Sequence, residues 1–173
     1  AQFNDQSYSP IGPITSWTWD FGDGNSSNVQ NPSHSYTTAG NFVVQLTVTD
    51  INGCSNSTTM NITIYPAAVA NAGADAGFCE GSNLALSGSG GGTYLWTPST
   101  GLSADNISNP IANPVATTTY TLTVTDVNGC QDTDDIVVTV NPLPTATFAA
   151  NNECLGTAVQ FTDQSTIATG NIM

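Results

Sequence analysis

Basic side chains are missing from this chain, which has no lysine and no arginine among its 173 residues. It has 13 acidic residues and a single histidine, and the formal net charge is −13. Proteins bind nucleic-acid phosphates and anionic membrane surfaces through Lys and Arg. The composition therefore excludes nucleic-acid binding and docking on anionic lipid, and inorganic cations must offset the acidic groups.

Long apolar runs and catalytic motifs are also missing. No apolar stretch approaches the roughly 18 residues that a membrane span requires, so we expect no membrane insertion. The sequence has no Gly-x-Ser-x-Gly, His-Glu-x-x-His or phosphate-binding loop. Only two Glu residues occur, and the Asp residues lie where turns are expected rather than as a pair facing a cleft. We therefore predict that this segment is not an enzyme. Because no basic and apolar leader precedes it, we expect an internal or mature segment.

Internal repeats are the main feature that the sequence does contain. Residues 44–54 and residues 120–130 share the pattern Leu-Thr-Val-Thr-Asp-x-Asn-Gly-Cys at an offset of 76. Ala-Gln-Phe-Asn-Asp-Gln-Ser at 1–7 matches Val-Gln-Phe-Thr-Asp-Gln-Ser at 159–165, at an offset of 158. Ile172 then falls on Ile14. Repeats at such periods indicate tandem modules, and the third module is expected to resemble the first.

Each module has the pattern of β-strands. Apolar residues occupy every second position from Phe42 to Val48 and from Tyr120 to Val124, which predicts half-buried strands. Asn-Gly pairs at 52–53 and 128–129 follow these strands and predict hairpins with type I′ turns. Modules of about 75–80 residues with some seven short strands are typical of an immunoglobulin-like sandwich. The predicted fold class is all-β, with tandem immunoglobulin-like β-sandwich modules.

Four cysteines lie at equivalent positions of these modules. Cys79 and Cys154 lie near module fronts, and Cys54 and Cys130 follow the Val-Thr-Asp strands. We predict that Cys79 pairs with Cys130, and that Cys54 pairs with Cys154 of the preceding repeat or subunit. Zinc is the rival interpretation, but there is no Cys-x-x-Cys and the single histidine lies in another motif. Disulfides indicate an oxidising, extracellular compartment.

One motif resembles a known family. Trp-Thr-Trp-Asp-Phe-Gly-Asp-Gly at 17–24 is followed by Asn-Pro at 31–32, His34-Ser-Tyr36 and Ala-Gly at 39–40. This pattern is similar to the polycystic kidney disease (PKD) domain. The resemblance implies a PKD-like sandwich over residues 1–66 that lacks its first strand, and the opening strands of another PKD-like module over residues 143–173.

The middle module, residues 67–142, resembles another group of proteins. Gly-Thr-Tyr-Leu-Trp-Thr-Pro at 92–98, Asn-Pro at 109–110 and Thr-Thr-Thr-Tyr at 117–120 are similar to the immunoglobulin-like repeats of gliding-motility-associated surface adhesins of the Bacteroidota. Both resemblances imply a module of a long cell-surface protein, exported by type IX secretion.

The aromatic residues of these motifs are expected in the cores. Trp17, Trp19 and Phe21 share one face of a strand, and His34 and Tyr36 share another. A lone histidine on such a strand is expected to be packed and hydrogen-bonded rather than catalytic. The structural core residues that we predict are Trp17, Trp19, Phe21, His34, Tyr36 and Trp96.

The acidic clusters suggest calcium as the one candidate cofactor, because this ion prefers oxygen ligands. One cluster lies near a module junction and consists of Asp126, Asn128, Asp132, Asp134 and Asp135. A second, weaker candidate consists of Asp20, Asp23 and Asp50. The alternatives are a solvated strand edge that resists aggregation and carboxylates that cap turns through backbone N–H groups.

Three functions fit the sequence. The first is a structural repeat segment of an extracellular bacterial surface stalk or filament, whose partners are neighbouring copies of the repeat in one chain or as subunits. The second is an adhesin module that recognises a glycan or a protein, which an exposed Trp96 favours and a buried Trp96 counts against. The third is a spacer domain of a secreted hydrolase. In the first case we expect residues 143–173 to complete the next module, within one polypeptide or by strand donation.

Overall fold

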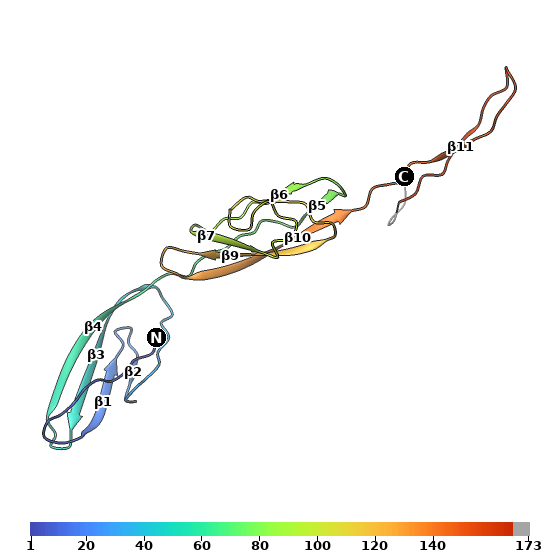
Figure 1. Ribbon diagram of the computed structural model, residues 1–173. Coiled ribbons are helices and arrows are strands. Elements are labelled where there is room, and N and C mark those ends of the chain that lie inside the picture. The colour runs from blue at the N-terminus through green and yellow to red at the C-terminus, as the bar shows by residue number, and fades with distance from the viewer. Residues whose placement is uncertain (168–173) are drawn as a thin grey trace. The chain divides into compact units, whose positions relative to one another are not determined.

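The computed structural model describes residues 1–167, and the chain divides into two compact units, Ala1–Pro66 and Ala67–Met173. All regular secondary structure in the described residues is β-strand (Figure 1). The fold class that the sequence predicts, all-β with immunoglobulin-like modules, is confirmed. No described segment is a helix with the length and apolar character to cross a membrane. The match of Ile172 to Ile14 lies outside the described residues.

The first unit contains a four-stranded antiparallel sheet with the order β2-β1-β3-β4. Its strands are β1 (Ile14–Asp20), β2 (Ser26–Ser27), β3 (Gly40–Asp50) and β4 (Ser55–Ile64). The alternation in β3 has the expected result, because Val44 and Leu46 are buried while Val43 is exposed. Their side chains form a small core with Trp19 and Phe21.

The other layer of the first unit is irregular chain rather than a regular sheet. Gln2 and Ser33 form an isolated antiparallel bridge. Phe3 packs from this layer against Trp19 and Phe21, with ring centroids 5.4 and 5.3 Å apart respectively. Residues 1–7 therefore cover one part of the core face of the sheet.

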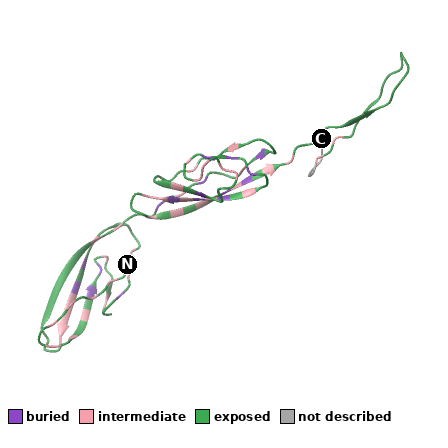
Figure 2. Cartoon of the chain, in the orientation of Figure 1, coloured by how far each residue is buried: buried purple, intermediate pink, exposed green. Residues whose placement is uncertain are grey.

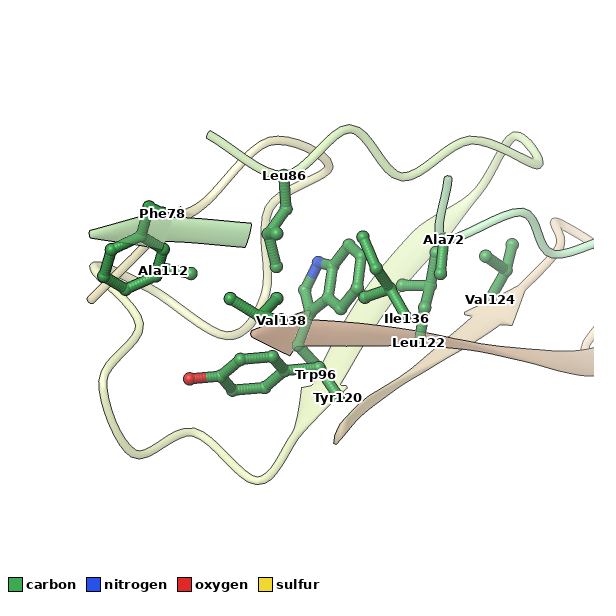
Figure 3. Packing of buried hydrophobic residues seen from close by; sticks show 10 residues of the cluster. All are labelled: Ala72, Phe78, Leu86, Trp96, Ala112, Tyr120, Leu122, Val124, Ile136 and Val138. Carbon is green, nitrogen blue, oxygen red and sulfur yellow. The ribbon is translucent and has the colours of Figure 1, made fainter. Parts of the chain in front are cut away.

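The second unit encloses the larger core. Its main sheet has the order β5-β10-β9-β7, and a short sheet pairs β6 with β8. The strands are β5 (Ala76–Cys79), β6 (Leu84–Ala85), β7 (Thr93–Thr97), β8 (Ile111–Ala112), β9 (Thr118–Thr125) and β10 (Gln131–Asn141). Side chains of both sheets pack in one core around Trp96, which is one of the ten residues shown in Figure 3. β5 is parallel to β10, whereas β9 is antiparallel to both of its neighbours.

A separate hairpin follows β10. Its strands β11 (Phe148–Ala150) and β12 (Phe161–Asp163) pair only with each other among the described strands. Almost every residue from 143 to 167 is exposed (Figure 2). Phe148 and Phe161 lie 5.9 Å apart between ring centroids, yet 69% and 65% of their surfaces remain exposed. This hairpin has no core of its own.

Both Asn-Gly pairs lie in hairpin turns, but the turn type differs from the prediction. Gly53 N donates to Asp50 O and Asp50 N donates to Cys54 O, each at 3.0 Å. Among the non-glycine residues described, none has a positive φ, while Gly53 and Gly129 have φ of 83°. These are three-residue loops in which a type I turn precedes a left-handed glycine. The Asp50 carboxylate favours this loop because it accepts the Asn52 and Cys54 N–H groups at 2.8 and 3.0 Å.

Candidate functional site

The Trp-Asp-Phe-Gly-Asp-Gly motif forms the tight connection between β1 and β2. Asp20 Oδ1 accepts the Gly22 N–H at 2.9 Å, and Asp23 Oδ1 accepts the Asn25 N–H at 3.1 Å. Gly22 has φ +77°, and a Cβ at this position would lie 2.6 Å from Val43 O. Glycine is therefore required here by both backbone conformation and close approach, and the two carboxylates act as turn caps.

His34 joins this motif to the core. Its Nε2 lies 2.7 Å from Asp23 Oδ2, and its ring stacks on Phe21 with centroids 4.1 Å apart. Tyr36 meets the His34 ring edge-on and donates its hydroxyl hydrogen to Phe21 O at 3.0 Å. Burial raises the pKa of Asp23, but hydrogen bonds from His34 and Asn25 outweigh it and the pKa is lowered. Each polar side-chain atom named in this paragraph is hydrogen-bonded within the first unit. These contacts hold the motif against the core.

Asp5 is a central residue that the sequence analysis missed. Its carboxylate accepts hydrogen bonds from Trp17 Nε1 at 2.7 Å, from Ser7 N at 2.9 Å and from Gln30 Nε2 at 3.2 Å. Burial raises the pKa of this carboxyl, but the hydrogen bonds together hold the pKa below its ordinary value. The sequence did carry a signal, because Asp5 and Ser7 recur in the repeat as Asp163 and Ser165. Asp163 likewise accepts the Ser165 N–H at 2.9 Å.

The acidic residues do not assemble into the predicted calcium sites. Residues 1–167 contain no group of three His, Cys, Asp or Glu side chains placed to hold a metal ion. Asp132 and Asp134 point to one side of β10 and accept the Ala70 and Ala72 N–H groups, both at 2.8 Å. Asp135 has the opposite parity and is exposed. Asp132 and Asp134 therefore bind backbone donors, and calcium binding by this cluster stays a prediction.

Four other aspartates of the two calcium sets cap turns: Asp20, Asp23, Asp50 and Asp126. Asp126 Oδ1 accepts the Asn128 and Cys130 N–H groups at 2.8 and 2.9 Å. In the first unit, Asp20 pairs with Gln45 and Asp50 pairs with Ile14. Asp20 and Asp50 therefore lie at opposite ends of the β1–β3 pair, and the second predicted set does not converge on one point.

The structure also corrects the predicted Cys79–Cys130 disulfide. All four cysteines are free. Cys79 is opposite Asn141 at one end of β10, whereas Cys130 directly precedes Gln131 at the other end. Eleven residues at roughly 3.3 Å each separate the two positions along the strand, and a disulfide requires Cα atoms closer than about 7 Å. The two cysteines are far apart because β5 runs parallel to β10, which places Cys79 at the C-terminal end of β10.

Cys54 and Cys154 occupy exposed loops. Cys54 closes the β3–β4 turn, and Cys154 begins a turn in the hairpin, where its carbonyl accepts the Thr157 N–H at 3.0 Å. Pairing of Cys54 with Cys154 of a neighbouring copy stays a prediction.

Trp96 is fully buried. Its exposed fraction is 0%, and its Nε1 donates to Ile107 O at 2.9 Å. The side chain is therefore a packing and hydrogen-bonding element of the second core. It is not available as an aromatic surface for a glycan.

A groove opens beside the core of the first unit. It has a volume of about 490 Å³ and is lined by Phe3, Asn4, Trp19, Val44, Leu46 and Met60, among others. Met60 of β4 is directly opposite Val44 on the core face of the sheet, yet Met60 is 69% exposed and Val44 only 3%. The buried Trp19 Nε1 has no hydrogen-bond partner among the described residues. The groove is therefore lined by buried core residues and by the exposed side chain of Met60.

Comparisons with known proteins identify the first unit. A family model described as PKD domain matches residues 1–64. A microbial collagenase of Vibrio alginolyticus is 39% identical over 61 residues, which is 35% of this chain and 8% of the collagenase. The chain thus spans less than a tenth of the length of this curated relative.

Two solved structures are similar to the same region. The crystal structure of the PKD1 domain of Vibrio anguillarum Epp is 44% identical and covers 34% of this chain and 70% of that chain, with a TM-score of 0.34. The PKD1 domain from the Vibrio cholerae metalloprotease PrtV is 42% identical and covers 34% and 73% respectively, with a TM-score of 0.34.

Proposed function

Because residues 1–64 belong to the PKD domain family, we propose that this chain is a structural repeat segment of an extracellular bacterial surface stalk or filament. The observation that carries the proposal is the repetition of one module pattern at offsets of 76 and 158 residues. Tandem modules that each have their own core provide length and stiffness. Such a segment acts as a spacer and performs no chemistry.

The side-chain arrangement supports this function. Asp132 and Asp134 bind backbone N–H groups, and His34 contacts Asp23 and Phe21. The aromatic residue that an adhesin would present, Trp96, is enclosed in the second core. These residues are used to build the modules, which leaves the adhesin alternative without its best anchor.

A spacer domain of a secreted hydrolase is the second candidate. It is favoured by the names of the relatives, which include a microbial collagenase and the pre-pro-metalloprotease PrtV. In that case the modules would hold a catalytic domain that lies elsewhere in the polypeptide. An extracellular location is common to both candidates. The Bacteroidota type of repeat in the second unit and export by type IX secretion belong to the first candidate.

Electron microscopy of intact cells that make the protein tests the proposal. Gold-labelled Fab fragments against the first unit should bind without permeabilisation and should mark several evenly spaced points on each surface fibre. Labelling that is confined to a soluble secreted enzyme would favour the hydrolase spacer. Labelling only after permeabilisation would contradict both candidates.

A further inference from the structure

The repeat allows the β11–β12 hairpin to be compared with residues 1–7 of the first unit. At the offset of 158, β12 corresponds to Phe3–Asp5. In the hairpin, Phe148 is opposite Asp163, Ala149 opposite Thr162 and Ala150 opposite Phe161. Gln164 N donates to Thr147 O at 2.9 Å. Because hydrogen-bonded pairs alternate in an antiparallel ladder, the backbone groups of Thr162 and Gln164 are those that face β11.

The first unit leaves the corresponding backbone groups open. Residues 1–7 use their other edge, where Phe3 N donates to Pro32 O and His34 N donates to Ala1 O, both at 2.9 Å. Asn4 and Gln6 are the counterparts of Thr162 and Gln164, since 162 − 158 = 4 and 164 − 158 = 6. Their N–H groups have no hydrogen-bond partner among residues 1–167.

The groove lies beside this open edge. Asn4 and Gln6 line it together with Thr58 and Met60 of β4 and with Leu46 of the core. An added strand here would gain backbone hydrogen bonds from the open edge. It would also cover apolar surface of Met60, which is 69% exposed at present.

We propose that this groove accepts the β11 segment, residues 145–152, of a second copy of this chain. The strand runs antiparallel to residues 3–6, with Ala149 opposite Asn4 and Thr147 opposite Gln6, as in the register of the repeat. The inference rests on the repeat architecture proposed above and adds the partner and its alignment.

The chemistry of the β11 segment fits this site. Residues 145–152 carry no charge, so docking brings no further carboxylate to a chain of net charge −13. Phe148 is 69% exposed in the hairpin. Docking in the repeated register places Phe148 near Phe3, the counterpart of its present neighbour Phe161.

The hairpin must open for this exchange, because β11 presents the same edge to β12. An isolated two-stranded hairpin is marginally stable in water, and this one pairs three residues on each strand. The docked strand instead joins a unit that has an apolar core. The exchange therefore replaces a weak pairing by an equivalent pairing beside a core.

Titration of the full chain with a synthetic peptide of residues 144–152 tests the proposal. We expect binding by calorimetry and shifts of the Asn4 and Gln6 amide signals and the Trp19 indole signal in NMR spectra. A peptide N-methylated at Ala149 loses the N–H that bonds to Asn4 and should bind about tenfold more weakly. A peptide N-methylated at Ala150, whose N–H faces the opposite edge, is the matched control and should keep its affinity.

Two chain variants complete the test. Met60→Glu places a carboxylate at the groove and should abolish peptide binding, whereas Val43→Glu changes an exposed residue on the opposite face and should retain it. Equal affinity of the two methylated peptides, or absence of any binding at about 1 mM peptide, would overturn the acceptor site.

Sedimentation of the full chain tests the donor. We expect self-association that rises with concentration and that an excess of the peptide suppresses. A chain that binds the peptide but stays monomeric at every concentration would overturn a second copy as the source of the strand. These results are independent of the cell-labelling experiment, so failure of the proposed function and failure of this site are distinguishable.

Discussion

At single positions, acidic side chains accept hydrogen bonds from backbone N–H groups that no neighbouring strand pairs with. Asp132 and Asp134 bind the N–H groups of Ala70 and Ala72, and Asp75 binds that of Val137. The chain that leads into the second unit is held to β10 by these carboxylates. Calcium was a reasonable expectation from the sequence because a run of acids does not reveal which donors lie opposite each of them.

Replacement of Asp134 tests this role. Asp134→Ala leaves the N–H of the fully buried Ala72 without a partner, and it should destabilise the second unit by about 1–3 kcal/mol. Asp135→Ala removes the same charge from an exposed side chain of the same strand and should have little effect. Denaturant unfolding of both variants measures the difference. Equal effects would show that net charge, and not the hydrogen bond, matters.

Trp96 should be the residue on which the second core depends most. Trp96→Ala removes a side chain that is 0% exposed, and its loss should reduce the free energy of unfolding by about 3–5 kcal/mol. Val127→Ala, at a position that is 95% exposed, is the control in the same unit. Calorimetry should show a lower transition temperature for the second unit only. A variant as stable as the parent chain would contradict the packing described for this residue.

Asp5 should make the first unit sensitive to acid. Its pKa in the folded chain lies below the ordinary value of 3.8, so its ionised form stabilises the fold. This contribution is complete above the unfolded pKa and is lost as the pH falls through the folded pKa. The stability difference between the parent chain and Asp5→Asn should therefore be constant above about pH 5 and shrink below pH 3.8. Urea unfolding from pH 7 to pH 2.5 measures it, and a difference that grows on acidification would refute the assignment.

Strands with strict alternation were predictable from the sequence. β3 and β9 follow the period-2 pattern, and the aromatic residues of β1 lie on one face as the motif indicates. The turn type was not predictable from Asn-Gly alone, because the carboxylate before it favours a three-residue loop. The disulfide prediction failed for a topological reason. Matching positions in two modules say nothing about whether the first strand of a module runs parallel or antiparallel to its last strand.

The arrangement of β5 and β10 gives a testable statement about the thiols. An unreduced monomer treated with iodoacetamide should contain no peptide pair linked through Cys79 and Cys130, because the two residues lie at opposite ends of β10. Mass spectrometry of the digest, without reduction, detects such a link. Its presence would show that β5 does not pair with β10 in this register.

The same experiment on associated chains separates two hypotheses about Cys154. In the register proposed for the groove, the docked strand continues beyond Ala1, where His34 lies, whereas Cys54 is at the Asp50 end of the sheet. Pairing of Cys54 with Cys154 and strand docking in this register therefore exclude each other within one unit. A Cys54–Cys154 peptide would contradict the register.

For the molecule as a whole, the composition limits which interactions can stabilise the repeated units. A chain without Lys or Arg cannot form salt bridges except through His34 or its amino terminus, and the structure places His34 Nε2 2.7 Å from Asp23 Oδ2. Stability must come from the two apolar cores and from hydrogen bonds to Asp, Asn, Ser and Thr side chains. Each unit has its own core. In the stalk or filament proposed above, each unit would carry load through its own core.

Single-molecule extension of the full chain between its two ends tests this account most directly. If each unit is folded around its own apolar core, pulling should give two discrete unfolding events. Each should lengthen the chain by on the order of 20 nm, since an extended residue spans roughly 3.3–3.6 Å. Chelation of divalent cations should leave both events unchanged. Featureless extension, or an unfolding force that collapses on chelation, would contradict a metal-independent structural role.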